Sequence, residues 1–476
     1  MARHFFAALT QNPISLAGTA LAAASLTLII ALVIIQALGF EGGAYLGILT
    51  FLVIPAFFVL GLVLIPVGIM RQRRKAAKSA PPGEAPPLFP IIDLNEEKTR
   101  KGVIVFLVLT VVNIIVLAGV TYKGVEIMDS VAFCGTACHV VMEPEYTAHQ
   151  RSPHSRVKCV DCHIGPGADW FVRSKLDGAW QMVAVTLDIY PRPIPTPLHD
   201  LRPARDTCEQ CHWPTVFVGD KLKIETTFDE DEDNTELRNA ILLKVGGLHG
   251  RESHGIHWHV DPGVEIRYRS DSSRMTIYDV EMTLADGTVK LWQAGETPPD
   301  AEDWRIMDCV DCHNRPTHIF RTPEEELDQA MAAGKIDVTL PYVKREGVRI
   351  LRGAEYDSHA EARIGISEAL HGYYRENYPE VLAERAAAVT EAADVMGDIF
   401  SWNVFPHMKV RWDETYPDHS GHPPVRAREN APGCFRCHTR DHQTAEGERI
   451  SRRCDLCHTV LATREEDPEI LRILNP

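Results

Sequence analysis

Residues 159–163 read Cys-Val-Asp-Cys-His, and this pattern, two cysteines separated by two residues and followed directly by histidine, decides how the chain is organised. The pattern returns at 208–212, 309–313, 434–438 and 454–458. A sixth pair, Cys134 and Cys138 followed by His139, has one extra residue between its cysteines. The 476-residue chain holds 12 cysteines, so these pairs use all of them. The chain is therefore built around six copies of one motif.

Three kinds of chemistry use closely spaced cysteine pairs: a redox disulfide, a zinc site and covalent attachment of haem. Neither a disulfide nor a zinc site needs a histidine directly after every second cysteine. In c-type haem attachment the two thiols bond the porphyrin, and the imidazole that follows binds the iron. The sequence therefore predicts six covalently bound c-type haems. The predicted attachment residues are Cys134, Cys138, Cys159, Cys162, Cys208, Cys211, Cys309, Cys312, Cys434, Cys437, Cys454 and Cys457. The predicted proximal iron ligands are His139, His163, His212, His313, His438 and His458.

Each haem iron has a second axial position, which electron carriers usually fill with histidine or methionine and catalytic haems leave open. The chain has 21 histidines, so enough remain outside the motifs to fill these positions. An ordinary surface histidine is the alternative interpretation of each. The candidates for the second position are Met142, His149, His154, His199, His257, His318, His407 and His442.

Three long uncharged runs near the N-terminus predict transmembrane helices at about 16–38, 45–70 and 103–122. A cleaved signal peptide is the alternative for the first run. However, its apolar stretch exceeds the usual ~7–15 residues and no small-residue cleavage site follows. Pro55 and Pro66 leave open a re-entrant second segment, but a kinked span is favoured because neighbouring helices tolerate such prolines.

Lysine and arginine gather in the loop at 71–101, whereas the first connection holds only Glu41. By the positive-inside rule this loop and the N-terminus are cytoplasmic, and the chain after residue 122 lies in the periplasm of an inner-membrane protein. That placement agrees with the haem prediction, since the extracytoplasmic compartment differs from the cytosol in its thiol chemistry. The exported part carries roughly −20 charges, which argues against nucleic acid and suits a basic electron carrier, with solubility as the alternative.

The predicted fold is a membrane-anchored multihaem cytochrome c. Its three N-terminal helices lead into a mainly helical or irregular haem-packed domain with a small β-rich insertion. The expected segments are an anchor at 1–122, a three-motif region at 123–215, a β-rich insertion at 216–305, one motif plus helices at 306–400 and two motifs at 401–476.

Alternating patterns at 264–269, 275–284 and 289–292, with an Asp286-Gly287 turn, predict the strands of the insertion. Its acidic run at 229–233 lacks the glycine and final glutamate of a calcium loop, so a solvated turn is the favoured interpretation.

Residues 103–215 resemble the NapC/NirT-type membrane-anchored multihaem cytochromes c. The resemblance rests on the third apolar run, Cys134 to His139, Met142, Glu145-Tyr146 to His149, His154, Cys159 to His163 and Phe171 to Trp180. It implies a haem at the membrane surface, ligated by Met142 and reduced by a quinol bound beside it, with Lys175 or Asp177 near the quinol headgroup. The chain departs from that pattern in its three helices, its widened first motif and its extra motifs. Its layout looks more like larger inner-membrane cytochromes linked to respiration on extracellular metals.

The sequence thus predicts a cytochrome that takes electrons from the membrane quinol pool and passes them to a soluble or membrane-bound acceptor cytochrome or reductase, in anaerobic or metal-linked respiration. Two alternatives stay open. One is a terminal reductase of a small nitrogen or sulfur oxyanion at an open haem. The other is a passive electron-transfer subunit of a larger membrane complex.

Overall fold

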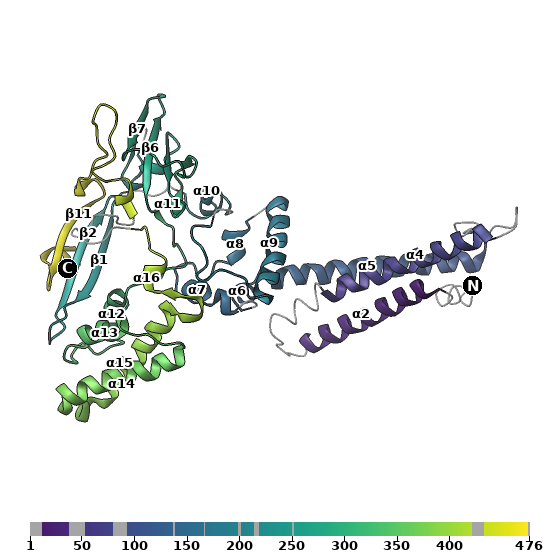
Figure 1. Cartoon of the computed structure of the whole chain (residues 1–476), viewed down its shortest axis with the longest axis horizontal. Coiled ribbons are helices and arrows are strands. Elements are labelled where there is room, and N and C mark those ends of the chain that lie inside the picture. The colour runs from purple at the N-terminus through teal and green to yellow at the C-terminus, as the bar shows by residue number, and fades with distance from the viewer. Residues whose placement is uncertain are drawn as a thin grey trace. The chain divides into compact units, whose positions relative to one another are not determined.

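A computed structural model describes most of the chain in two compact units, residues 1–137 and 138–476 (Figure 1). The described residues are 12–37, 53–79, 93–136, 139–165, 167–198, 201–213, 219–249, 252–420 and 433–474. The predicted residues Cys138 and His199 lie outside these ranges.

The first unit consists of helices α2 (Pro13–Ala37), α4 (Ile54–Ser79), α5 (Glu97–Met128) and α6 (Val131–Thr136). In the described part of this unit α2, α4 and α5 are long and apolar enough to cross a membrane. Pro66 lies inside α4, which continues through it. Because α4 runs on to Ser79 and α5 begins at Glu97, the connection between them is shorter than the predicted loop at 71–101.

Small residues let α2 and α4 pack closely. A Cβ atom on Gly61 would lie 2.7 Å from the backbone nitrogen of Ala22. The buried Ser15 hydroxyl donates a hydrogen bond of 2.8 Å to the carbonyl of Ile65 in the facing helix. Close backbone approach and an interhelical hydrogen bond are the usual means by which helices associate in a membrane.

The second unit begins with α7 (His139–Gln150), α8 (Cys159–His163), α9 (Ala168–Thr186) and α10 (Ala204–Cys208). The later motifs lie in α11 (Cys309–Cys312), η5 (Gly433–Arg436) and η6 (Cys454–Leu456). The aspartate inside the Cys-Val-Asp-Cys-His motif helps to start the helical turn. The Asp311 carboxylate accepts from the Asp308 backbone N–H at 2.7 Å, and Asp161 accepts from that of Lys158 at 3.2 Å. Such contacts satisfy backbone donors at a helix start.

Two antiparallel sheets follow. One has the order β1-β2-β11, built from Lys221–Phe228, Glu236–Leu243 and His458–Glu465. The other has the order β7-β6-β5-β8, built from Val289–Gln293, Ile277–Leu284, Val264–Ser270 and Arg305–Ile306. Strands β5, β6 and β7 lie at the alternating patterns, and Gly287 has the positive φ that the Asp286-Gly287 turn needs. Strand β11 begins at the histidine of the last motif. The first sheet of the predicted insertion at 216–305 is therefore completed by a strand from outside that segment.

Short elements join the two sheets: the hairpin of β3 (Gly247–His249) and β4 (Glu252–His254), and the 3-10 helix η3 (Ile256–Val260). Trp258 of η3 packs against the buried core between β5, β6 and β7, which includes Tyr268, Val280 and Trp292. The Tyr268 hydroxyl donates to Asp311 of the third regular motif at 2.5 Å. The second sheet is therefore attached directly to a predicted haem site.

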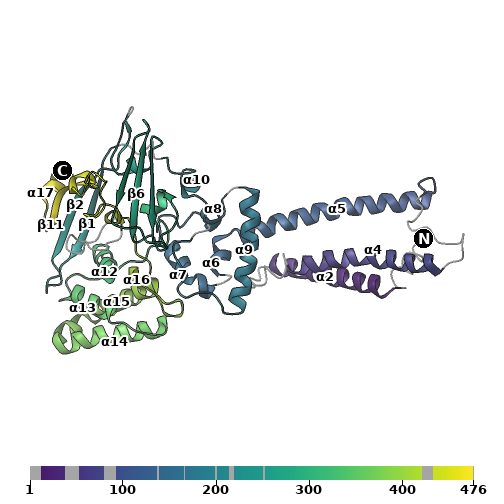
Figure 2. The same ribbon diagram turned by 45° about the horizontal axis from the view of Figure 1, so that its top comes forward.

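Helices α12 (Pro323–Ala332), α13 (Val343–Arg352), α14 (His359–Asn377) and α15 (Pro379–Asn403) form the main hydrophobic core of the second unit. Figures 1 and 2 show them gathered at the end of this unit opposite the β5-β6-β7 strands. All four helices lie in the segment 306–400, for which the sequence predicts one motif plus helices. The remaining elements are β9 (Val404–Phe405), η4 (Pro406–Met408), β10 (Val410–Arg411), α16 (Trp412–Thr415) and α17 (Glu469–Leu474).

The acidic run forms the turn between β1 and β2. Asp231 accepts from the Thr235 backbone N–H at 2.8 Å, and residues 229–233 are mainly exposed. Next to them the buried Asn234 amide donates to the carbonyls of Val338 and Leu340. The turn is thus solvated, and Asn234 fastens it to the four-helix core.

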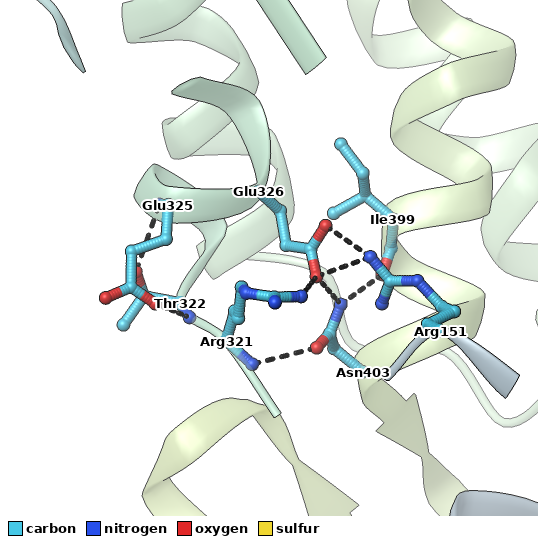
Figure 3. Close-up of polar contacts among 7 residues, drawn as sticks. All are labelled: Arg151, Arg321, Thr322, Glu325, Glu326, Ile399 and Asn403. Atoms are coloured by element: carbon cyan, nitrogen blue, oxygen red, sulfur yellow. Dashed lines mark hydrogen bonds and ion pairs between the residues drawn. The ribbon is translucent and has the colours of Figure 1, made fainter. Parts of the chain in front are cut away.

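A buried ion pair fastens the same core to the haem-motif region (Figure 3). The side chain of Glu326 on α12 is 3% exposed. Its two carboxylate oxygens accept hydrogen bonds of 2.8 Å and 2.7 Å from the guanidinium of Arg151, the residue that follows α7. Asn403 donates to the same carboxylate at 3.2 Å, and Arg321 lies 3.5 Å away. The guanidinium of Arg151 also lies over the Trp402 ring. One buried carboxylate therefore joins three segments of the chain.

Candidate haem sites

Four motif histidines each face a second histidine ring that comes from a different part of the chain. The ring centroids are 6.2 Å apart for His163 and His318, 5.9 Å for His212 and His154, 6.5 Å for His313 and His257, and 6.0 Å for His438 and His259. With metal–nitrogen bonds of ~2.0 Å on both sides, an iron held between two imidazoles would separate their centroids by about 6.3 Å. The four distances match that separation.

Aromatic rings in contact span a similar range of distances, so the hydrogen bonds of these rings provide a second test. Nδ1 of His154 lies 3.0 Å from the Pro316 carbonyl, and Nδ1 of His259 lies 2.7 Å from that of Ile256. Nδ1 of His438 lies 2.6 Å from the Ser451 carbonyl. A bond from Nδ1–H to a carbonyl leaves Nε2 as the metal-binding nitrogen, which is the usual arrangement of histidine ligands. The residues present therefore fit c-type haems.

His318 shows the same arrangement together with a nearby charge. Its Nδ1 lies 3.0 Å from the Glu145 carbonyl and 3.1 Å from the Glu145 carboxylate. Burial lowers the pKa of His318 to about 4, which keeps the imidazole in the neutral form that binds iron. Burial raises the pKa of Glu145, and the guanidinium of Arg315, 3.8 Å away, opposes that shift.

Replacing Glu145 with glutamine is expected to raise the reduction potential of the haem at Cys159 and Cys162 by about 60 mV, a tenfold change in its one-electron equilibrium. The carboxylate beside Nδ1 of His318 makes the imidazole a stronger donor and so favours the oxidised iron. A spectroelectrochemical titration measures the shift. The matched control is Glu143→Gln on the exposed side of the same helix, and an equal shift there would contradict the assignment.

Several predicted ligands are placed away from any motif histidine among the described residues. Nε2 of His149 lies 3.0 Å from the Val157 carbonyl, and its Nδ1 is 3.2 Å from the Gln150 amide. His407 is exposed, and its Nε2 lies 3.2 Å from the Arg192 guanidinium and 3.3 Å from the Tyr190 hydroxyl.

Two buried histidines near the last motifs each have a ring nitrogen with no hydrogen-bond partner among the described residues. They are Nε2 of His442, whose Nδ1 lies 2.8 Å from the Thr439 hydroxyl, and Nδ1 of His419. A buried imidazole nitrogen without a partner is costly unless it binds something. His442 therefore retains the features of a ligand, although no motif histidine ring lies in contact with it in the described structure.

The attachment cysteines form a series in space. Interaction with the Cys309 thiol lowers the pKa of Cys208, and interaction with the Cys208 thiol raises that of Cys309. Burial raises the pKa of Cys162, and the neighbouring Cys208 adds to this effect. Burial also raises the pKa of Cys312, and there the neighbouring Cys434 adds to it. Cys434 likewise adds to the effect of burial on the pKa of Cys457. The five regular motifs therefore neighbour one another in chain order.

The residues predicted for quinol binding lie on two helices. Met142 is half-buried in α7, and Lys175 and Asp177 lie on α9, where Lys175 is half-buried and Asp177 exposed. Val141 of α7 and Val185 near the end of α9 belong to the same apolar cluster. Each helix thus contributes a side chain to this one apolar cluster.

Sequence reasoning did not select His259, although the chain carries it two residues after His257. The signal that could have found it is the His257-Trp258-His259 spacing next to two motifs that each need a partner. Both histidines lie on η3, and each faces a different motif.

Membrane-spanning helices joined to a unit with repeated haem-attachment motifs and facing histidines define a class, the membrane-anchored multihaem c-type cytochromes. Residues 96–190 match the model of the NapC/NirT cytochrome c family, N-terminal region. The chain is 41% identical over 463 residues to the cytochrome c-type protein ImcH of Geobacter sulfurreducens, which covers 96% of this chain and 89% of that protein. It is 33% identical over 78 residues to the cytochrome c-type protein NrfH of Wolinella succinogenes, covering 16% of this chain and 44% of that protein.

The chain therefore belongs to the NapC/NirT family of membrane-anchored multihaem cytochromes c, as the sequence predicted. Covalently bound haem c and electron transfer follow from that membership. No solved structure matches the chain.

Proposed function

We propose that this cytochrome takes electrons from quinol in the inner membrane and passes them through six covalently bound haems to an acceptor outside the membrane. The N-terminus and the basic loop would lie in the cytoplasm and the second unit in the periplasm. The haems, when bound, would supply one-electron carriers along the whole path.

The observation that carries this proposal is the series of neighbouring attachment cysteines. The first motif begins in α6, directly after the membrane-spanning α5, and the five others follow one another from Cys162 to Cys457. Electron transfer between bound groups needs short distances, and an ordered series of neighbouring sites meets that need. The path would start at the membrane and end at the Cys454 motif.

The chain's own residues would then have distinct tasks. Motif cysteines fix each group covalently, and His163 with His318 and His212 with His154 would hold the irons of two sites from both sides. Met142 would ligate the first site, with quinol bound near Lys175 or Asp177. Two imidazoles at a site leave no open iron position for a small oxyanion, so the geometry supports electron transfer over terminal reduction at those sites.

Anaerobic mixing of the purified, detergent-solubilised full chain with a menaquinol analogue tests the proposal. We expect the haem absorption bands to shift to the reduced form, with slower reduction in Lys175→Ala by about tenfold. The control, Lys290→Ala on β7, should reduce at the normal rate. Protein that dithionite reduces fully but quinol does not reduce would contradict quinol oxidation. Copurification of a polytopic subunit that restores the reaction would then identify the chain as a passive electron-transfer subunit.

A further inference from the structure

The short turn η3 carries two histidines whose rings each face the histidine of a different motif. We propose that His257 and His259 bind the irons of two different haems, those of the Cys309 and Cys434 motifs, so that one rigid turn couples the two sites. This inference rests on the proposed function only in that both require bound haem. It assigns His259 an iron-binding role and gives η3 a role in fixing two neighbouring haems.

The two rings point to different sites because of the helix type. A 3-10 helix turns by roughly 120° per residue, so side chains two positions apart leave the axis in clearly different directions. The His257 ring lies 6.5 Å from the His313 ring with 28° between their planes. The His259 ring lies 6.0 Å from the His438 ring with 72° between their planes. Both separations fit an iron between two imidazoles.

The backbone of η3 is held in place by contacts within the chain. Gly255 has φ +81°, and a Cβ atom there would lie 2.7 Å from the backbone nitrogen of Gly246. The Ile256 N–H donates to the Lys244 carbonyl at 2.8 Å, and the Lys244 N–H donates to the Cys457 carbonyl at 2.8 Å. The start of η3 is therefore connected through Lys244 to the last motif.

The other end and the middle of η3 are anchored as well. Arg205 of α10 donates to the Val260 carbonyl at 2.8 Å, which connects η3 to the Cys208 motif. Trp258 packs between the two histidines against the core of the second sheet. The same core includes Cys437 among its partly buried members. One turn of five residues thus contacts elements of three motifs directly and is connected to a fourth through Lys244.

The neighbouring motifs are themselves joined, as two coupled sites require. Arg436, between Cys434 and Cys437, donates to the carbonyl of Asp311 in the Cys309 motif and, at 2.7 Å, to that of Arg274. Two irons held from opposite sides by one turn and by these joined motifs would keep a fixed separation and orientation.

The different plane angles predict different spectra. Imidazole planes near parallel produce a rhombic low-spin signal in electron paramagnetic resonance, whereas planes near perpendicular produce a strongly anisotropic one. We therefore expect the Cys309 haem to show the first kind of signal and the Cys434 haem the second. This assignment follows from the angle between the ring planes, which is 28° at the Cys309 motif and 72° at the Cys434 motif.

The test uses the oxidised holoprotein without quinol, so that its outcome is separate from that of quinol reduction. His257→Gly should convert one rhombic low-spin haem to high spin, and His259→Gly one strongly anisotropic haem, with an unchanged haem count by mass. Added imidazole should restore each low-spin signal by filling the space left. The control, His371→Gly on α14, should change neither signal.

Gly255→Ala should perturb both signals together, because the added Cβ displaces the whole turn. The proposal is overturned if His259→Gly leaves every haem low-spin, or if either single variant converts both haems. It is also overturned if the converted haem in a correctly loaded variant does not respond to imidazole. Quinol-dependent reduction of the wild-type protein can fail without affecting any of these outcomes.

Discussion

A chain in which Cys309 and Cys312 are both replaced by alanine is expected to lose one haem and to be reduced by quinol at about three of its five remaining haems. The reason is the order of the sites. Ala204, at the start of the helix that carries Cys208, donates to the Asp308 carboxylate beside Cys309 at 2.8 Å, and Arg436 of the Cys434 motif donates to the carbonyl of Asp311. Removing the site between them separates the three sites nearer the membrane from the two beyond it.

The comparison variant for this experiment removes the last site instead, through Cys454→Ala and Cys457→Ala. Both variants lose one haem, but quinol should reduce all remaining haems when the last site is missing. Dithionite should reduce all remaining haems in both, which shows that they are intact. Full quinol reduction of the Cys309–Cys312 variant would mean that electrons bypass this site, and the series would then have to be branched.

Replacing Glu326 with alanine is expected to destabilise the second unit by about 3–5 kcal/mol, the typical cost of removing one partner from a buried ion pair. The carboxylate is 3% exposed and accepts from Arg151 and Asn403, so its loss leaves a guanidinium and an amide buried without their partner (Figure 3). Denaturant unfolding followed by circular dichroism measures the loss.

Glu325→Ala is the matched control one residue away. Glu325 is exposed, and its carboxylate accepts from the Thr322 backbone N–H at 3.2 Å, so about 1 kcal/mol is expected. Equal losses in the two variants would show that helix capping, rather than the buried pair, holds the four-helix core to the motif region. Glu326→Gln should fall between them because it keeps the hydrogen-bonding shape without the charge.

Local patterns predicted much of the regular structure. The uncharged runs overlap α2, α4 and α5, and the alternating residues at 264–269 overlap β5. The burial of charged residues on α13, Lys344 and Glu346, escaped prediction because it depends on the elements packed around that helix. Its Lys344 is buried and lies 2.6 Å from the Asp328 carboxylate. Strand β11 escaped for a different reason, since it pairs with β2, a strand far away along the chain.

The sequence by itself determined the family, the membrane anchor and the predicted attachment of haem, because the two thiols and the proximal histidine of each motif are contiguous and their spacing survives any fold. Which histidine faces which motif was decided by the tertiary structure alone. His318, His257 and His259 come from segments remote from the motifs they face. An iron needs its second ligand at a fixed distance and direction, and only the packing of distant segments sets these.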